Sequence, residues 1–109
     1  NPDEIIGNLS GGQKQSVALA RSIYFGAKLL ILDEPTASLS LKEVRRVLDL
    51  ITEINKKGVS IIFITHNIYH VYPVANRFTI LERGKKIKDI EKKNATPEDI
   101  IKAIITGRY

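Results

Sequence analysis

Hydrophobic side chains recur along the chain at two spacings, one typical of helices and the other of strands. Helical spacing is found between residue 13 and Gly26, between residue 41 and Gly58, and after Thr96. In the second segment the apolar positions form one stripe, which consists of Val44, Val47, Leu48, Ile51 and Ile54. Thr96 followed by Pro97 is typical of a helix start, so residues 96–107 are predicted to form the last long helix.

Continuous apolar runs lie between these helices and predict strands. "KLLILDEP" (28–35) and "VSIIFITH" (59–66) are apolar on both faces, which is typical of buried strands in a parallel sheet. Residues 67–75 predict a short helix that is interrupted near Pro73, and residues 77–91 predict a hairpin that turns at Gly84. The alternation of helices and strands predicts an α/β fold.

Composition excludes several classes of site. The 109 residues are 43% hydrophobic and 27% charged, which is typical of one globular domain. The sequence has no cysteine, so disulfides, thiolate metal sites and cysteine nucleophiles are excluded. No apolar run approaches the roughly 20 residues of a spanning helix, and we expect the chain to be soluble. We interpret the net charge of +5 as a solvated lysine-rich surface and expect no nucleic-acid partner.

The stretch "LSGGQ" (Leu9 to Gln13) places two glycines at a predicted helix start, where each costs about 0.8–1 kcal/mol relative to alanine. A capping box would explain Ser10 and Gln13 but not Gly11 and Gly12. Glycines remove side-chain bulk at the end of a helix where free N–H groups and a partial positive charge can receive a phosphate. From these residues alone, an anion site and a plain helix cap both remain open.

Polar residues follow both predicted strands. Asp33 and Glu34 end the first strand and His66 ends the second, and the carboxyl ends of parallel strands meet at one edge of a sheet. Asp33 is a candidate ligand for Mg²⁺ through water, and Glu34 a candidate to orient or deprotonate an attacking water. The alternative is a pair of solvated carboxylates in a turn beside a structural histidine.

The ordered set "LSGGQ", "LLILDEP", "TASLS" and "IIFITH" resembles the C-terminal half of the ATP-binding cassette of ABC transporters over nearly the whole chain. The resemblance implies a P-loop NTPase-like parallel sheet flanked by helices, with a C-terminal β-hairpin and helix. Residues 1–109 would then be the C-terminal portion of one ABC ATPase domain. Residues 1–26 would hold the signature motif and its helix, and residues 27–109 the Walker B strand, the D-loop, the switch histidine and the C-terminal elements.

The resemblance also implies roles for single residues near the nucleotide. The signature would consist of Leu9, Ser10, Gly11, Gly12 and Gln13. Within it, Ser10, Gly11 and Gly12 would grip the γ-phosphate of an ATP that is held mainly by a second, partner cassette. This implication answers why two glycines are accepted at a helix start.

The remaining implied site residues follow the two strands. Asp33 and Glu34 would end the Walker B strand, with Asp33 as the metal ligand and Glu34 as a catalytic residue, and His66 would be the catalytic switch histidine. Residues 37–40 would form the D-loop, from which Ser38 and Ser40 would contribute to the nucleotide site. Ser40 stands where many other cassettes have aspartate.

ATP and Mg²⁺ are the cofactors that the resemblance implies, and a second cassette and membrane permease subunits are the partners. The permease would be contacted through a helical subdomain that this sequence lacks. The stretches "ARSIYFGAKLLILDEPTASLSLKEV" and "THNIYHVYPVANRF" are most similar to cassettes of monosaccharide importers. We therefore expect a cytoplasmic ATPase subunit at the inner face of the cell membrane that energises sugar import.

The phosphate loop GxxxxGK[ST] does not occur in the 109 residues. We therefore expect the chain to be a fragment that does not hydrolyse ATP alone, because nothing in it would cradle the phosphates. The missing central strand would leave an apolar edge beside residues 59–64. Such an edge predicts self-association, local rearrangement or pairing with the hairpin strand at residues 77–84.

Three other interpretations remain from the sequence. A DNA-repair or chromosome-organising ATPase shares such motifs, although the chain has no sustained heptads. His66 and His70 could form a zinc pair at i, i+4, but Asn67 stands where the accompanying glutamate is needed. The third is a non-catalytic regulatory fragment.

Overall fold

The computed structural model describes residues 11–108. The chain divides into two compact units, and the boundary lies between His66 and Asn67. The first unit holds two helices and a parallel pair of strands, and the second holds a hairpin with short and long helices. The predicted element order is confirmed throughout these residues.

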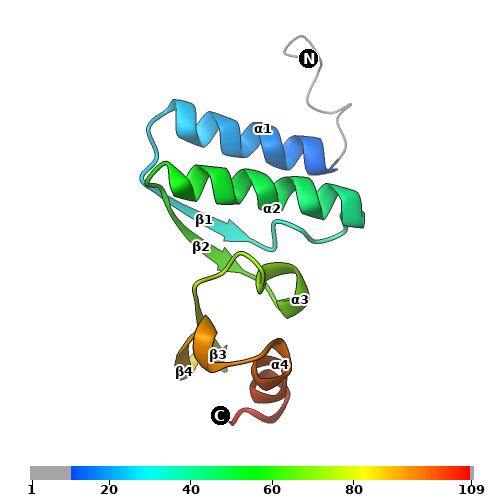
Figure 1. The fold of residues 1–109 in the computed structure, drawn as a ribbon, viewed down its shortest axis with the longest axis vertical. Coiled ribbons are helices and arrows are strands. Elements are labelled where there is room, and N and C mark those ends of the chain that lie inside the picture. Colours follow the sequence, from blue (N-terminus) through cyan, green and yellow to red (C-terminus); the bar gives the residue numbers. More distant parts are fainter. Residues whose placement is uncertain (1–10, 109) are drawn as a thin grey trace. The chain divides into compact units, whose positions relative to one another are not determined.

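The first unit runs in the order α1 (Gly11–Tyr24), β1 (Leu29–Asp33), α2 (Leu41–Lys56) and β2 (Ser60–Ile64). The two strands pair in parallel from Leu29 opposite Ser60 to Asp33 opposite Ile64. Helices α1 and α2 lie side by side along this sheet (Figure 1). The parallel pairing requires the crossover through α2, so the carboxyl ends of both strands reach the same edge.

The core of the first unit lies where the two helices meet one face of the sheet. Its buried side chains come from α1, β1, α2 and the loop between α2 and β2: Leu19, Leu30, Val47, Ile51, Ile54 and Val59. The stripe predicted along residues 44–54 is thus the face of α2 that packs inward. Burial of each such side chain contributes about 1.5–3 kcal/mol, which holds the helices on the sheet.

The other face of this sheet is apolar and open. Its four aliphatic side chains are between 47% and 63% exposed: Leu29, Ile31, Ile62 and Ile64. Ile31 is paired with Ile62, so these side chains form one continuous patch. The prediction that both faces are buried is therefore wrong for this face, because the helices of this unit cover only one side of the sheet.

The second unit contains α3 (Ile68–Val71), β3 (Arg77–Glu82), β4 (Lys85–Glu91), a 3₁₀ turn (Lys92–Asn94) and α4 (Pro97–Thr106). The antiparallel strands β3 and β4 are joined at Arg83 and Gly84, whose φ angles are 49° and 77°. Two positive φ angles define the type I′ turn of a tight hairpin, which confirms the predicted turn. Helix α3 ends two residues before Pro73, as its predicted interruption requires.

Helix α4 packs against the hairpin to form the core of the second unit. The buried side chains of these elements are Phe78, Ile80, Ile90, Ile100 and Ala103. Thr96 caps α4 with Pro97 at its first turn, and Gly107 ends it with a φ of 67°. The predicted cap is thus confirmed.

Each sheet of the described residues contains two strands. Strand β2 pairs with β1, and β3 pairs with β4. Pairing of the 59–64 strand with the hairpin, one of three outcomes expected for its edge, is therefore not formed in residues 11–108.

Candidate functional site

The carboxyl ends of β1 and β2 bring the predicted polar residues to one edge. The Glu34 N–H donates to the carbonyl of Ile64 at 2.7 Å, which extends the pairing one residue beyond β1. Glu34 then turns into a left-handed conformation with a φ of 50°. The chain leaves β2 through Thr65 and His66, opposite Glu34.

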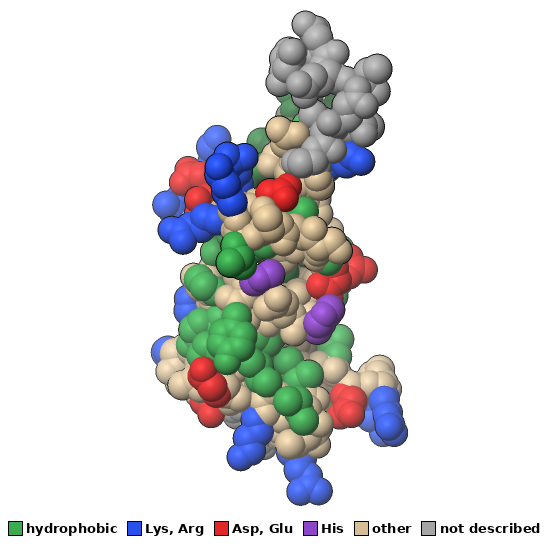
Figure 2. Space-filling view, turned by 90° about the vertical axis from the view of Figure 1, so that its right-hand side faces the viewer, with side chains coloured by type: hydrophobic (Ala, Val, Ile, Leu, Met, Phe, Trp, Pro, Cys, Tyr) green, Lys and Arg blue, Asp and Glu red, His purple; other side chains and the backbone are tan. Residues whose placement is uncertain are grey.

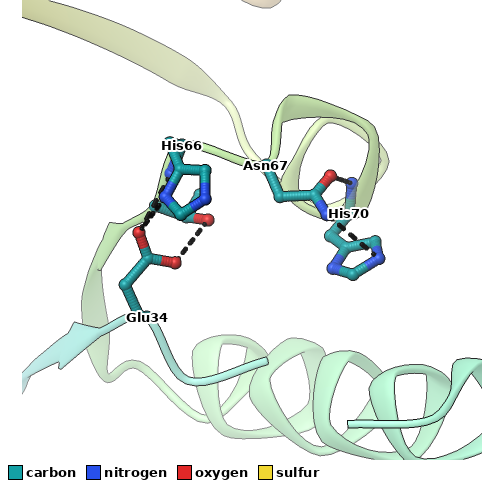
Figure 3. A network of polar contacts seen from close by, with 5 residues as sticks. Glu34, His66, Asn67 and His70 are labelled. Carbon is teal, nitrogen blue, oxygen red and sulfur yellow. Dashed lines mark hydrogen bonds and ion pairs between the residues drawn. The ribbon is translucent and has the colours of Figure 1, made fainter. Parts of the chain in front are cut away.

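The carboxylate of Glu34 is held by three groups of the opposite strand end (Figure 3). Its Oε1 lies 2.6 Å from Nδ1 of His66 and accepts the His66 backbone N–H at 3.2 Å. Its Oε2 accepts the hydroxyl of Thr65 at 3.0 Å. Because an ionised carboxylate can only accept, Nδ1 of His66 is the donor in this contact.

Glu34 and His66 differ in exposure, and this difference matters for chemistry. The Glu34 side chain is 31% exposed, whereas that of His66 is 87% exposed. Partial burial acts to raise the pKa of the Glu34 carboxyl, but hydrogen bonds from the His66 ring, the Thr65 hydroxyl and the His66 N–H outweigh it and hold that pKa below its ordinary value. Glu34 is therefore ionised at neutral pH and can accept hydrogen bonds from water.

Asp33 is exposed at the end of β1, next to Glu34 in the chain. An exposed carboxylate at a strand end fits Mg²⁺, which is held by one or two carboxylates together with waters and substrate phosphates. Residues 11–108 contain no group of three or more acidic or histidine side chains placed to hold a metal ion. A magnesium ion here would therefore depend on ligands from the nucleotide and water.

The glycine pair begins α1 and packs closely against the start of α2. The Gly12 N–H donates to Oε2 of Glu43 at 2.9 Å. A Cβ on Gly12 would lie 2.8 Å from that oxygen, and a Cβ on Gly11 would lie 2.9 Å from Cδ2 of Leu39. The two glycines thus allow a close approach within this chain itself.

The signature residues differ in whether the structure describes them and in how exposed they are. Leu9 and Ser10 lie outside the described residues. Gly12 is buried, whereas Gly11 and Gln13 are exposed in the first turn of α1. The phosphate contacts that the resemblance implies for these residues stay a prediction.

The loop between β1 and α2 holds the two predicted serines. Ser38 is exposed and has a φ of 62°. Ser40 is the N-cap of α2: its Oγ accepts the Glu43 N–H at 3.2 Å and donates to Oε1 of Glu43 at 3.1 Å. Ser40 therefore has a structural role as a helix cap, and its hydroxyl makes a bond to the Glu43 carboxylate that an ionised aspartate could not make.

The two histidines do not share a helix, as the zinc-pair interpretation requires. His66 precedes α3, whereas His70 lies in it. Nε2 of His70 lies 3.3 Å from Nδ2 of Asn67, and the His66 ring contacts Glu34. Figure 2 shows both rings, in purple, at the surface. The zinc interpretation is therefore not supported by the placement of these residues.

Sequence reasoning missed Thr65 and Glu43. Thr65 immediately precedes His66, so its position at a strand end was a usable signal. Glu43 completes the pattern Ser-x-x-Glu from Ser40, which is typical of a capping box. Its second contact, with Gly12, spans 31 residues and has no local signal.

Helices packed on a parallel strand pair, with acidic and histidine side chains at its carboxyl edge, define part of a P-loop NTPase-like α/β domain. A model of the ABC transporter family matches residues 1–37. The chain is 50% identical over 93 residues to the xylose/arabinose import ATP-binding protein XylG of Sulfolobus acidocaldarius, covering 85% of the chain and 37% of the relative. The sequence of the chain is thus similar to the ATP-binding domains of ABC transporters.

Two further similarities agree with this family. The fructose import ATP-binding protein FrcA of Rhizobium meliloti is 45% identical over 107 residues, which cover 98% of the chain and 41% of the relative. The solved structure of an ATP-binding cassette of an ABC transporter superposes with a TM-score of 0.83 at 20% identity, covering 95% of the chain and 42% of that structure. This structure supports the fold alone.

The chain spans about two-fifths of the length of the curated relatives it matches. None of the helices in residues 11–108 combines the length and the apolar character needed to cross a membrane.

Proposed function

We propose that the chain is the C-terminal portion of an ATP-binding cassette that hydrolyses ATP to energise the import of a monosaccharide. The contact of Glu34 with His66 at the carboxyl edge of β1 and β2 is the observation that carries this proposal. The names of the relatives, which are xylose/arabinose and fructose import ATP-binding proteins, support the sugar class. No described feature favours the DNA-repair alternative.

In this proposal Glu34 acts on the water that attacks the γ-phosphate. Its carboxylate is ionised and fixed by Thr65 and His66, so it orients the water and accepts a proton from it. As the water oxygen bonds to the γ-phosphorus, the bond from that phosphorus to the bridging oxygen breaks and ADP leaves with that oxygen. His66 donates from Nδ1 to Glu34, and when the ring is doubly protonated its exposed Nε2–H can also donate to a phosphate oxygen. Both side chains thus stabilise one arrangement of water and phosphate.

Asp33 would hold Mg²⁺ in this proposal. The ion, when bound, neutralises negative charge on the transferring phosphoryl group. The carboxylate of Asp33 is exposed at the carboxyl end of β1, the edge of the sheet at which Glu34 also lies.

A second cassette is the proposed partner at the other end of the site. The signature residues Leu9 to Gln13 and the D-loop serines Ser38 and Ser40 would complete an ATP site whose phosphate loop belongs to the partner. Permease subunits would anchor the pair at the cytoplasmic face of the membrane. These assignments rest on the family and on the position of Gly11 and Gly12 at the start of α1.

The test uses a cassette that combines this chain with a phosphate-loop segment. Glu34→Gln should reduce ATP turnover by at least about 100-fold, as expected for loss of a general base, and leave ATP binding unchanged. Glu53→Gln is the matched control, because Glu53 is exposed on α2 and only pairs with Lys56 at 3.7 Å. Near-normal turnover of the Glu34 variant would contradict the proposed role.

The same experiment includes the 109-residue chain alone. We expect it not to hydrolyse ATP, since its sequence contains no GxxxxGK[ST] loop to bind the β- and γ-phosphates. The proposal would be contradicted if the chain alone hydrolysed ATP with Mg²⁺ and Glu34→Gln abolished that activity. The 109 residues would then not need a phosphate loop from another segment.

A further inference from the structure

Glu43 is bound at the N-termini of two helices at once. Its Oε1 accepts the Ser40 hydroxyl at 3.1 Å and the Ser40 N–H at 3.4 Å, which completes the capping box of α2. Its Oε2 accepts the N–H of Gly12, in the first turn of α1, at 2.9 Å. One carboxylate therefore connects the start of α1 to the start of α2.

The space around Gly12 shows how close this connection is. A Cβ at Gly12 would lie 2.8 Å from Oε2 of Glu43 and 3.0 Å from its Cβ. A side chain at this position would displace the flexible carboxylate end of Glu43 from its place beside the helix. Glycine at position 12 therefore gives the Glu43 carboxylate room to approach the helix, independently of any ligand.

Electrostatics favours the same contact. The first turn of α1, Gly11 to Lys14, contains no acidic residue, so that helix start receives no negative charge from its own sequence. Carboxylates are stabilising near the N-termini of helices because free N–H groups and the helix dipole give a partial positive charge there. Glu43 supplies this charge to α1 while it caps α2.

We propose that Glu43 is a positioning residue that fixes the glycine pair of the signature against the D-loop. The inference rests on the proposed function for its consequence, since the fixed element is the proposed phosphate-binding turn. Two glycines weaken the first turn of α1, and the bond from Glu43 restrains that turn. Gly12 is thus the buried, anchored glycine, and Gly11 is the one whose backbone stays exposed.

The first measurement is amide hydrogen exchange at Gly12 in the 109-residue chain, without nucleotide. Glu43→Gln should raise this exchange rate by about tenfold, the loss expected for one charge-assisted hydrogen bond. Glu53→Gln makes the same change at an exposed position of the same helix and should leave the rate unchanged. An unchanged rate in the Glu43 variant would overturn the proposal.

The second measurement separates positioning from simple capping of α2. Ser40→Ala removes the hydroxyl of the capping box but keeps the Glu43 carboxylate, whose Oε2 can still accept the Gly12 N–H, so exchange at Gly12 should rise less than in Glu43→Gln. Equal rises in both variants would reduce Glu43 to a cap of α2 and overturn the proposal.

The third measurement is ATP-driven dimerisation of the cassette, compared with ATP binding to a single cassette. Glu43→Gln should weaken dimerisation by about tenfold and leave single-cassette binding unchanged. Stronger dimerisation would mean that the carboxylate competes with phosphate for the Gly12 N–H, which overturns the positioning role. If the unaltered cassette does not dimerise with ATP, the proposed function fails and the positioning role with it, while the exchange result still decides whether the contact exists.

Discussion

The two sheets of the described residues differ in how completely their apolar side chains are buried. In the hairpin of the second unit, Phe78, Ile80 and Ile90 are buried against other parts of that unit, and the opposite face carries polar residues such as Thr79 and Asp89. In the first unit both faces of the β1/β2 sheet are apolar, and only one is covered. The apolar side chains of the hairpin are buried within the second unit. One apolar face of the parallel sheet, in contrast, is left exposed.

Connectivity explains this difference. The strands of the hairpin are joined by the two-residue turn at Arg83 and Gly84, so their pairing is local. Strands β1 and β2 are paired through the crossover of α2, and parallel sheets are normally covered on both faces. The β1/β2 sheet, which carries the candidate site at its carboxyl edge, is therefore the sheet whose apolar side chains are less completely buried.

The largest effect is expected from the open face of the first unit. Replacing Ile31 and Ile62 with threonine removes apolar surface worth about 1–2 kcal/mol per side chain in any contact. If second copies of the chain associate through this face, the double variant should raise the dissociation constant by at least about tenfold. Light scattering over a concentration series provides the measurement.

The matched control for the open face is Leu81→Thr, which changes a single exposed aliphatic side chain of the hairpin. We expect it to leave association unchanged. Equal effects of the two changes, or a monomeric unaltered chain at all concentrations, would contradict the difference between the sheets.

A smaller effect is expected at Thr65. Thr65→Val keeps the shape of the side chain but removes the hydroxyl that donates to Oε2 of Glu34 at 3.0 Å. Loss of this hydrogen bond should lower ATP turnover of the cassette by about tenfold with little change in KM, because the proposed role of Glu34 is to act on water and not on nucleotide binding. Thr65→Ser should restore turnover. A valine variant with full turnover would show that His66 alone positions Glu34.

The smallest effect concerns the capping box of α4. Hydrogen bonds from the Thr96 N–H and hydroxyl lower the pKa of Asp99 below its ordinary value. Because the pKa is lower in the folded chain, Asp99 contributes stability that is present above the unfolded pKa and is lost as the pH falls through the folded value. Asp99→Asn should therefore reduce the loss of thermal stability of the second unit between about pH 6 and pH 2.

Glu98→Gln is the control for this pH dependence, since Glu98 lies in the same first turn of α4 but outside the capping box. Hydrogen exchange in α4 reports the second unit separately from the first. An identical pH dependence in the Asp99 and Glu98 variants would mean that the capping box does not sense pH.

Local features of the fold were predictable from the sequence, and long-range ones were not. Within residues 11–108 the sequence pattern located the α-helices and the strands but not the 3₁₀ turn at Lys92–Asn94. Gly84 and Thr96 marked the hairpin and the last helix, because these signals act within a few residues. The apolar runs of β1 and β2 predicted two covered faces, since periodicity reports the character of a side chain and not whether another element lies on it. The prediction that Glu34 and His66 meet at one edge was confirmed, because the carboxyl ends of parallel strands lie at the same edge of a sheet.

The contact between Gly12 and Glu43 had no such signal. Gly12 can be explained by its place at a helix start, and Glu43 by its place in a capping box. Because each residue has a local explanation, nothing in the sequence indicates that the two are in contact. Comparison of the two capping boxes makes this clear. In the first turn of α4 the same position is the shorter Asp99, whose carboxylate is bound to Thr96. The longer side chain of Glu43 reaches a second helix.

The left-handed backbone at Glu34 sets folding against chemistry at one position. A φ of 50° costs a residue with a side chain about 1 kcal/mol, a cost that glycine would avoid and asparagine would reduce. Selection for thermal tolerance alone would therefore drive this position away from glutamate. If Glu34 has the proposed role, a lineage that retains its carboxylate accepts a less stable chain, so stability and activity are expected to trade off at this residue during evolution.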